Sequence, residues 1–329
     1  MHDSLVRLHG PCPAPAYIAA RAAADVGFRK LRGVTTNDLV YNRFDGLLYA
    51  SVPSSSGANG NSIAVIDPMT ATILDTVFVG SEPGALALSD DGAALWVALT
   101  GASAVRRFDT ATRTAGFQFS LAPSAIPQKL AVLPGAEDSV VVVFDTEDTS
   151  GSPITAVFDH GIERTATISF PWLDEVVATY SPLLLYGQPD YRNDVYRLCV
   201  NSAGLFLDER ISAFTGPGDH AFSHGVLYGP NHAYDVASDS VIGSYSADGS
   251  VAPDVPTNRV FYLSSSGAIT AIDLATFAAA GSESFPLSPL GTASSLVRWG
   301  RYGFAFRVTD LNWPPRIWVV HSTLIPTQP

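Results

Sequence analysis

One hydrophobic pattern recurs along the chain: a strand-like run closes on two mostly apolar residues that are followed by a short polar residue. It occurs seven times, at Val65-Ile66-Asp67, Arg107-Phe108-Asp109, Val157-Phe158-Asp159, Cys199-Val200-Asn201, Ala233-Tyr234-Asp235, Ala271-Ile272-Asp273 and Val319-Val320-His321. The closing polar residues are spaced 42, 50, 42, 34, 38 and 48 positions apart. A period of roughly 40 to 45 residues is typical of one four-stranded propeller blade, and this spacing is too irregular for a helical solenoid.

The residues around these endings favour strands over helices. Ile63 to Ile66, Val140 to Phe144 and Ile317 to Val320 are β-branched or aromatic, and Gly, Pro, Ser or Asp bounds most such runs. We therefore expect an all-β chain that forms one seven-bladed β-propeller with four-stranded antiparallel blades.

Three stretches show the order of strands within a blade. Blade 1 is expected at Leu39 to Asn42, Leu47 to Val52, Ser62 to Asp67 and Ile73 to Val79. Blade 2 is expected at Ala85 to Ser89, Ala94 to Leu99, Ala104 to Asp109 and Thr114 to Leu121, and blade 6 includes Val260 to Leu263 and Ala268 to Asp273. An Asp after the third strand can accept backbone N–H bonds and hold the next turn. We therefore interpret Asp67, Asp109 and Asp273 as turn residues rather than catalysts.

A family resemblance rests on three runs: N-D-L-V-Y-N-R-F-D-G-L-L-Y-A-S-V, N-S-I-A-V-I-D-P-M-T and V-G-S-E-P-G-A-L-A-L-S-D-D-G-A-A-L-W-V-A-L. They resemble the YVTN family of propeller repeats, also called lactonase-like or surface-layer-like propellers. The match is close over Val34 to Leu121, fair over Asn258 to Leu287 and weak between them. The chain departs from the family because Gly-Ser-Glu-Pro has no second full copy and Trp96-Val97-Ala98-Leu99 replaces the naming tetrapeptide. The resemblance implies an extracytoplasmic or cell-surface propeller that presents a binding surface.

The chain ends predict how the ring closes. Only Ser322 to Pro329 follow the last ending, which is too short and Pro-broken for an outer strand, whereas Gly27 to Val34 precedes blade 1. We expect this N-terminal strand to complete the last blade and remove its sheet edge. The predicted domains are a tail at residues 1–26, with a short helix at Ala16 to Ala24, and one propeller at residues 27–329.

Composition and charge exclude several classes of partner. The formal charge is −12 and only two lysines occur, Lys30 and Lys129, whereas nucleic acid and anionic membranes attract clustered cations. No apolar run is long enough for a transmembrane helix, and the first residues lack the pattern of a secretory signal. We expect a monomer in which Cys12 and Cys199 do not pair, with Cys199 a buried free thiol in an apolar strand.

Acidic side chains gather in the segments that lead into the inner strands, at one mouth of the central channel. The predicted binding residues are Asp38, Glu82, Asp174, Glu175, Asp219 and Trp172, with Asn37, Gln128, Lys129, His220 and Thr292 in or near the same segments. Carboxylates suit a hydrated divalent cation or the hydroxyl groups of a sugar. No spacing among them encodes a coordination sphere, so solvated loop ends are the simpler interpretation.

A second cluster lies at Gly216 to His232, where His220 and His224 are four residues apart and Asp219 precedes them. On a strand this spacing places both imidazoles on one face. Asp219, His220 and His224 are therefore candidate metal ligands, and the two histidines are candidate catalytic acid–base groups, although they match no zinc motif.

Aromatic residues suggest a third kind of site. A stacking platform for a carbohydrate could form from Tyr186, Tyr191, Trp172, Trp313 and Tyr228. Packing between blades is the alternative interpretation, because aromatic side chains are also expected there.

Two functions remain open. The first is a non-enzymatic scaffold whose channel mouth binds a protein or a glycan, which the family resemblance favours. The second is a lyase or lactonase in which a divalent cation polarises a carbonyl and His220 or His224 moves a proton. Similar-looking propellers include lactonases and a streptogramin lyase, but their catalytic residues cannot be matched here one by one.

Overall fold

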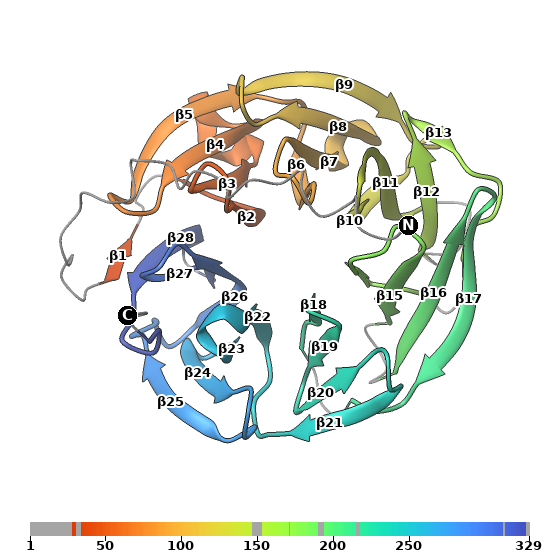
Figure 1. Ribbon diagram of the computed structural model, residues 1–329. Coiled ribbons are helices and arrows are strands. Elements are labelled where there is room, and N and C mark those ends of the chain that lie inside the picture. The colour runs from red at the N-terminus through yellow and green to blue at the C-terminus, as the bar shows by residue number, and fades with distance from the viewer. Residues whose placement is uncertain are drawn as a thin grey trace, which may run out of the picture.

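Seven four-stranded antiparallel sheets stand around a common axis (Figure 1). The computed structural model describes residues 28–30, 34–146, 153–170, 172–189, 194–214, 218–311 and 313–326. Helical segments in these ranges are short 3₁₀ turns, η2 (Ser54–Asn59), η3 (Thr100–Ala102) and η5 (Val255–Thr257). None of the helices described is long and apolar enough to cross a membrane. The seven-bladed β-propeller expected from the repeat is thus confirmed.

Each blade runs from an inner strand near the axis to an outer strand at the rim. Blade 1 consists of β2 (Asp38–Asn42), β3 (Leu47–Val52), β4 (Ser62–Asp67) and β5 (Thr72–Phe78), and blade 2 of β6 (Pro83–Leu88), β7 (Ala94–Leu99), β8 (Ala104–Asp109) and β9 (Thr114–Ser120). Blade 3 consists of β10 (Ile126–Leu133), β11 (Ala136–Asp145), β12 (Ile154–Asp159) and β13 (Ile162–Glu163), and blade 4 of β14 (Glu175–Ala178), β15 (Leu184–Gln188), β16 (Val195–Asn201) and β17 (Gly204–Ile211). Blade 5 consists of β18 (Ala221–Ser223), β19 (Val226–Gly229), β20 (His232–Asp235) and β21 (Ser240–Ser244), and blade 6 of β22 (Ser250–Asp254), β23 (Arg259–Leu263), β24 (Ala268–Asp273) and β25 (Ala279–Ser284). Blade 7 consists of β26 (Gly291–Trp299), β27 (Gly303–Asp310), β28 (Trp313–His321) and β1 (Phe28–Lys30).

All seven polar endings found in the sequence close the third strand of a blade. The Asp side chains then hold the turn into the fourth strand. Asp67 Oδ1 accepts the backbone N–H of Met69 at 2.8 Å, and Asp109 Oδ1 accepts that of Thr112 at 2.7 Å. Asp273 does the same at its own turn. Their interpretation as turn residues is therefore confirmed.

The N-terminal strand closes the ring, as expected. The last blade takes three strands from the C-terminal part of the chain and its fourth, β1, from the N-terminal part. The register pairs Phe28 with Val320 and Lys30 with Trp318. The edge of β28 is thereby covered, which is how closed propellers avoid an unpaired strand edge. The predicted tail helix lies outside the described residues.

Blade 3 departs most clearly from the regular pattern. Its outer strand β13 has two residues, and the chain then crosses toward blade 4, where Ala166 N donates to Ala203 O at 2.7 Å. Leu205 N returns a bond to Ala166 O at 3.0 Å. This irregular outer strand lies in the part of the chain where the family resemblance is weakest.

The hydrophobic core lies between blades as much as within them. Trp96 of blade 2 contacts Phe119 with ring centroids 6.0 Å apart, and Phe119 stacks on Phe158 of blade 3 at 5.0 Å. Leu48 of blade 1 similarly belongs to one buried cluster with Ile317 of blade 7. Because strands alternate their side chains between two faces, each sheet buries both faces against its neighbours.

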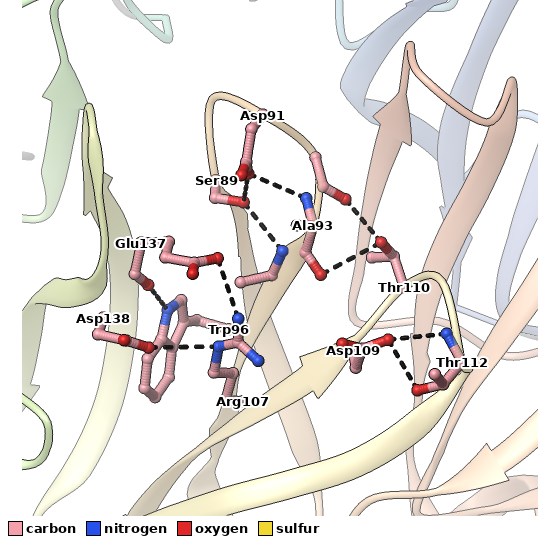
Figure 2. A network of polar contacts seen from close by, with 12 residues as sticks. Ser89, Asp91, Ala93, Trp96, Arg107, Asp109, Thr110, Thr112, Glu137 and Asp138 are labelled. Atoms are coloured by element: carbon pink, nitrogen blue, oxygen red, sulfur yellow. Dashed lines mark hydrogen bonds and ion pairs between the residues drawn. The ribbon is translucent and has the colours of Figure 1, made fainter.

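Polar contacts join blades 2 and 3 at the end of the ring where the inner strands finish (Figure 2). The indole Nε1 of Trp96 donates to Glu137 O at 2.8 Å. The guanidinium of Arg107 lies 3.0 Å from the carboxylate of Glu137 and 3.4 Å from that of Asp138. These contacts fix the angle between two blades whose apolar faces are already packed together.

Cys199 is a free thiol, but it is exposed rather than buried as expected. Its neighbours Leu198 and Val200 are buried in β16, and Cys199 points to the opposite face of the strand. The apolar run concealed this alternation, because β16 lies next to the outermost strand of its blade, where one face of the sheet is covered incompletely. Cys12 lies outside the described residues.

Candidate binding site at the mouth of the ring

The beginnings of neighbouring inner strands contact each other, and we call the face that they form the mouth of the ring. Asn37 Nδ2 donates to Pro83 O at 2.9 Å between blades 1 and 2. Asp219 N donates to Gly249 O at 3.1 Å between blades 5 and 6. The mouth therefore contains the segments in which the sequence placed most candidate binding residues.

Asp38 begins β2 and links blade 1 to blade 2. Its Oδ1 accepts the N–H of Leu39 at 2.8 Å, and its Oδ2 accepts that of Leu86 at 2.9 Å, where the register of β6 shifts. Burial raises the pKa of Asp38 above 3.8, and the two N–H bonds oppose this rise. Both oxygens are thus engaged by the fold, so Asp38 has little bonding capacity left for a ligand.

Glu175 and Asp219 form similar links on the other side of the ring. Glu175 Oε2 accepts the backbone N–H of His220 at 3.2 Å, which joins blade 4 to blade 5. Asp219 Oδ2 accepts a bond from Ser250 Oγ at 2.7 Å, and Ser250 Oγ accepts the N–H of Ser295 at 2.9 Å. The remaining oxygens, Glu175 Oε1 and Asp219 Oδ1, have no hydrogen-bond donor among the residues described.

His220 stands directly behind these carboxylates. Its side chain is 1% exposed, and Nδ1 lies 3.6 Å from Glu175 Oε2. Neither ring nitrogen has a hydrogen-bond partner in the described part of the chain. The ring packs edge-on against Phe214, with centroids 4.6 Å apart.

Negative charge accumulates between blades 4 and 5. Asp219 is exposed, although the inner strands around it remove part of its hydration. This desolvation raises the pKa of Asp219 above 3.8, and repulsion from Glu175 raises it further; the Ser250 bond, Lys129 and His220 oppose both. A carboxylate in this condition is stabilised by an added positive charge.

Lys129 supplies a positive charge from blade 3. Its positive charge acts on both Asp38 of blade 1 and Asp219, which leads into blade 5. Its ammonium has no hydrogen bond or ion pair with any residue that the structure describes. Arg307 of β27 also offsets the charge of Asp38, and its Nε donates to Thr36 O at 3.1 Å.

Three other predicted binding residues lie in the segments that precede inner strands. Glu82 accepts hydrogen bonds from Ser54 in η2, between blades 1 and 2. Asp174 is exposed in the segment that leads into β14, as is Trp172. Trp172 contacts Phe170 edge-on, with ring centroids 6.5 Å apart.

His224 does not join His220. It lies in the turn after β18 with φ of 50°, exposed, and its Nδ1 is 2.9 Å from Ser223 Oγ. The expectation that both imidazoles share one face of a strand is wrong, because the strand ends at Ser223 and the chain turns. Across the described ranges, no three His, Cys, Asp or Glu side chains gather in an arrangement that could hold a metal ion.

The predicted aromatic platform does not assemble either. Tyr186 and Tyr228 are buried in the clusters that join blades, so for them the packing interpretation is correct. Tyr191 and the side chain of Trp313 lie outside the described residues. Trp172 is left as the exposed member, with a neighbour, Phe170, that the sequence reasoning missed although the two are separated by a single residue.

The sequence reasoning also missed Ser250 and Arg307. Serine occurs throughout the chain, and nothing in its surroundings marks Ser250 as the link between Asp219 and Ser295. Arg307 lies on a second strand, whereas the search followed the segments that lead into first strands. Only the closed ring brings these residues to the mouth.

No protein-family model matches this chain, and no curated protein matches it. Among solved structures, it is similar to the β-propeller domain of Cps50 (Swd1) from Myceliophteria thermophila, with a TM-score of 0.64 and 11% sequence identity. The match covers 89% of this chain and 99% of that one. At such low identity the likeness is one of fold alone: the chain adopts a WD40-like seven-bladed β-propeller.

Proposed function

We propose that this chain is a non-enzymatic scaffold that binds a partner protein at the mouth of the ring, over blades 3 to 5. The observation that carries the proposal is the exposed aromatic pair in the segment before β14. Phe170 is 65% and Trp172 is 43% exposed, and the two rings contact each other. Exposed aromatic side chains held together on one face are typical anchors of protein interfaces.

The surroundings of the pair support this function. Ile126 begins the neighbouring inner strand β10 and is also exposed, and Lys129 follows it on the same strand. In such an interface the aromatic anchor contributes most of the affinity, and the nearby unpaired charges contribute specificity. The links made by Asp38, Glu175 and Ser250 hold the inner strands in place, so the surface is preorganised.

The fold and the repeat pattern add further support. Seven-bladed WD40-like propellers typically serve as protein-interaction scaffolds, and the similar solved domain has this fold. We extend the proposal to YVTN-type ancestry and an extracytoplasmic location, on the strength of the runs in blades 1 and 2. A glycan is the second candidate ligand, because Trp172 could also stack on a sugar ring.

Photo-crosslinking tests the proposal. A photoreactive phenylalanine analogue replaces Trp172 in one variant and Phe44 in another, since Phe44 is 52% exposed and lies in the β2–β3 turn at the opposite end of the ring. We expect a specific protein to crosslink to position 172, and we expect that the same protein does not crosslink to position 44. The Phe170→Ala, Trp172→Ala double variant should lose that partner in affinity capture, and Phe44→Ala should keep it.

Two results would overturn the proposed surface. One is a partner that is retained by the double variant at the level of the unchanged chain. The other is saturable binding on a glycan array that depends on Trp172 while no protein crosslinks there, which would favour the glycan.

A further inference from the structure

The strongest unexplained feature of the mouth is the group formed by Glu175, Asp219 and His220. Two carboxylate oxygens, Glu175 Oε1 and Asp219 Oδ1, have no donor among the described residues. Behind them the His220 ring is almost fully buried, faces Glu175 at 3.6 Å and has no hydrogen-bond partner on either nitrogen within the described chain. Buried polar groups are nearly always paired, so His220 is unusual, whereas the two carboxylates in front of it reach solvent and can accept a donor from outside.

The charge balance indicates the sign of what would complete it. Three carboxylates, Asp38, Glu175 and Asp219, face two cations at the mouth. Lys129 acts on Asp38 and Asp219, and Arg307 acts on Asp38. Lys129 contacts none of these carboxylates, because no ion pair joins it to any described residue. The site therefore retains one excess negative charge, and a cation fits it better than an anion.

The geometry indicates the kind of cation. A metal ion needs three or more ligands converging within about 2.0–2.6 Å of one point, and the described side chains do not converge in this way. A guanidinium instead spreads five N–H donors over a planar fork, so it can bond separate carboxylates at the same time. The two carboxylates come from neighbouring blades and lie close enough for Glu175 to raise the pKa of Asp219, so one forked donor can serve both.

We propose that Glu175 and Asp219 bind the guanidinium group of an arginine side chain presented by the partner protein, with the buried His220 holding Glu175 in place from behind. The proposal rests on the proposed function, since the arginine belongs to the protein bound beside Phe170 and Trp172. Lys129 opposes a second cation and thereby limits the site to one.

An NMR titration of the ¹⁵N-labelled chain tests this inference. The probe is N-acetyl-arginine methylamide, and the matched probe is N-acetyl-citrulline methylamide, which has nearly the same shape and no charge. We expect saturable amide shifts with the arginine probe and none with the citrulline probe. Increasing salt should weaken the binding, because the contact is between charges near the surface.

Three variants assign the site. The Glu175→Gln, Asp219→Asn double variant should weaken arginine binding at least tenfold, while Glu82→Gln, which removes one carboxylate charge elsewhere, between blades 1 and 2, should leave it unchanged. Lys129→Met should strengthen it several-fold, because it removes a like charge. Asp219→Asn alone keeps an oxygen for the Ser250 bond, so it reports on the site even if the double variant does not fold.

The outcomes separate this inference from the proposed function. Equal binding of both probes, unchanged binding by the double variant, or weaker binding by Lys129→Met would overturn the arginine site. If a partner still crosslinks through position 172 in that case, the scaffold stands and only the arginine site falls. If arginine binds as expected but no partner crosslinks, the proposed protein surface falls instead.

Discussion

The carboxylate of Asp38 lies 2.9 Å from the backbone nitrogen of Leu86, so a side chain of blade 1 satisfies a backbone donor of blade 2. The bond meets β6 where its register shifts between Pro83 and Leu86. A shift of this kind turns a backbone N–H away from its own ladder. In this ring the donor is taken up by the neighbouring blade, and the same occurs at Ser295, whose N–H is bonded by Ser250.

Removing the Asp38 carboxylate should therefore destabilise the fold. Asp38→Ala leaves the N–H groups of Leu86 and Leu39 without their acceptor, and we expect a loss of about 1–3 kcal/mol in the free energy of unfolding. Asp38→Asn keeps one acceptor oxygen and should lose less. Urea unfolding measures both, with Asp75→Ala as a control, because Asp75 bonds only the adjacent Thr76 N–H within blade 1. Equal stability of Asp38→Ala and the unchanged chain would contradict the link.

Deleting the closing strand should expose an edge. Removal of residues 1–30 takes away β1 and leaves β28 without its outer neighbour. We expect a fall in the melting temperature of several degrees and a tendency to associate through the free edge. Thermal unfolding and light scattering after size exclusion measure the two effects, and deletion of residues 1–26, which leaves β1 in place, is the matched control. A monomeric product of unchanged melting temperature would show that β1 contributes nothing to closure.

Local signals explain which parts of this fold were predictable. The seven third-strand endings, and the turns held by Asp67 and Asp109, depend on residues only a few positions apart. The strand ranges expected from these signals match the observed strands to within about two residues. Bonds between blades depend on residues about 30 to 50 positions apart, such as Asp38 with Leu86 or Asp219 with Ser250. A repeat pattern does not show which residue of one blade will lie against which residue of the next.

The residues of the candidate site also divide into those that a local signal predicts and those that it does not. Glu175 and Asp219 were found because they stand just before or at the start of an inner strand, which spacing reveals. The separation of His224 from His220 was missed because a left-handed turn at position 224 depends on where the hairpin closes. A run of polar and glycine residues does not fix that position.

The Asp159–Arg164 pair should make stability fall in acid. Arg164 bonds both oxygens of Asp159, at 2.7 and 2.8 Å, and this contact lowers the pKa of Asp159 below 3.8. Because the pKa of Asp159 is lower in the folded chain than in the unfolded chain, the charged carboxylate stabilises the fold at pH values above its ordinary pKa. This contribution is lost as the pH falls through the lowered pKa of the folded chain. Asp159→Asn should cost about 1 kcal/mol at pH 7, a small value because the pair is partly exposed. Its difference from the unchanged chain in urea unfolding should narrow below about pH 4.

The charge of Asp219 should have the opposite effect on the stability of the fold. Its pKa is raised, so the charged carboxylate is unfavourable in the folded chain at neutral pH, and protonation relieves this cost. Asp219→Asn keeps an acceptor for Ser250 and removes the repulsion from Glu175. We expect it to be at least as stable as the unchanged chain at pH 7, with any advantage shrinking as pH falls toward 3.8. A clear loss of stability at pH 7 would mean that the charge itself, and not the hydrogen bond, holds blades 5 and 6 together.

The exposure of Cys199 predicts its reactivity. Partial burial of Cys199 raises the pKa of its thiol above 9.0, and the nearby charge of Asp208 raises this pKa further. Only the thiolate reacts, so in a Cys12→Ser background we expect a maleimide to modify the folded protein completely but more slowly than free cysteine at pH 8. Asp208→Asn should speed the reaction about two-fold or more by stabilising the thiolate. If modification required denaturant, Cys199 would be enclosed in solution, and the outer face of β16 would have to be covered there by something other than β17.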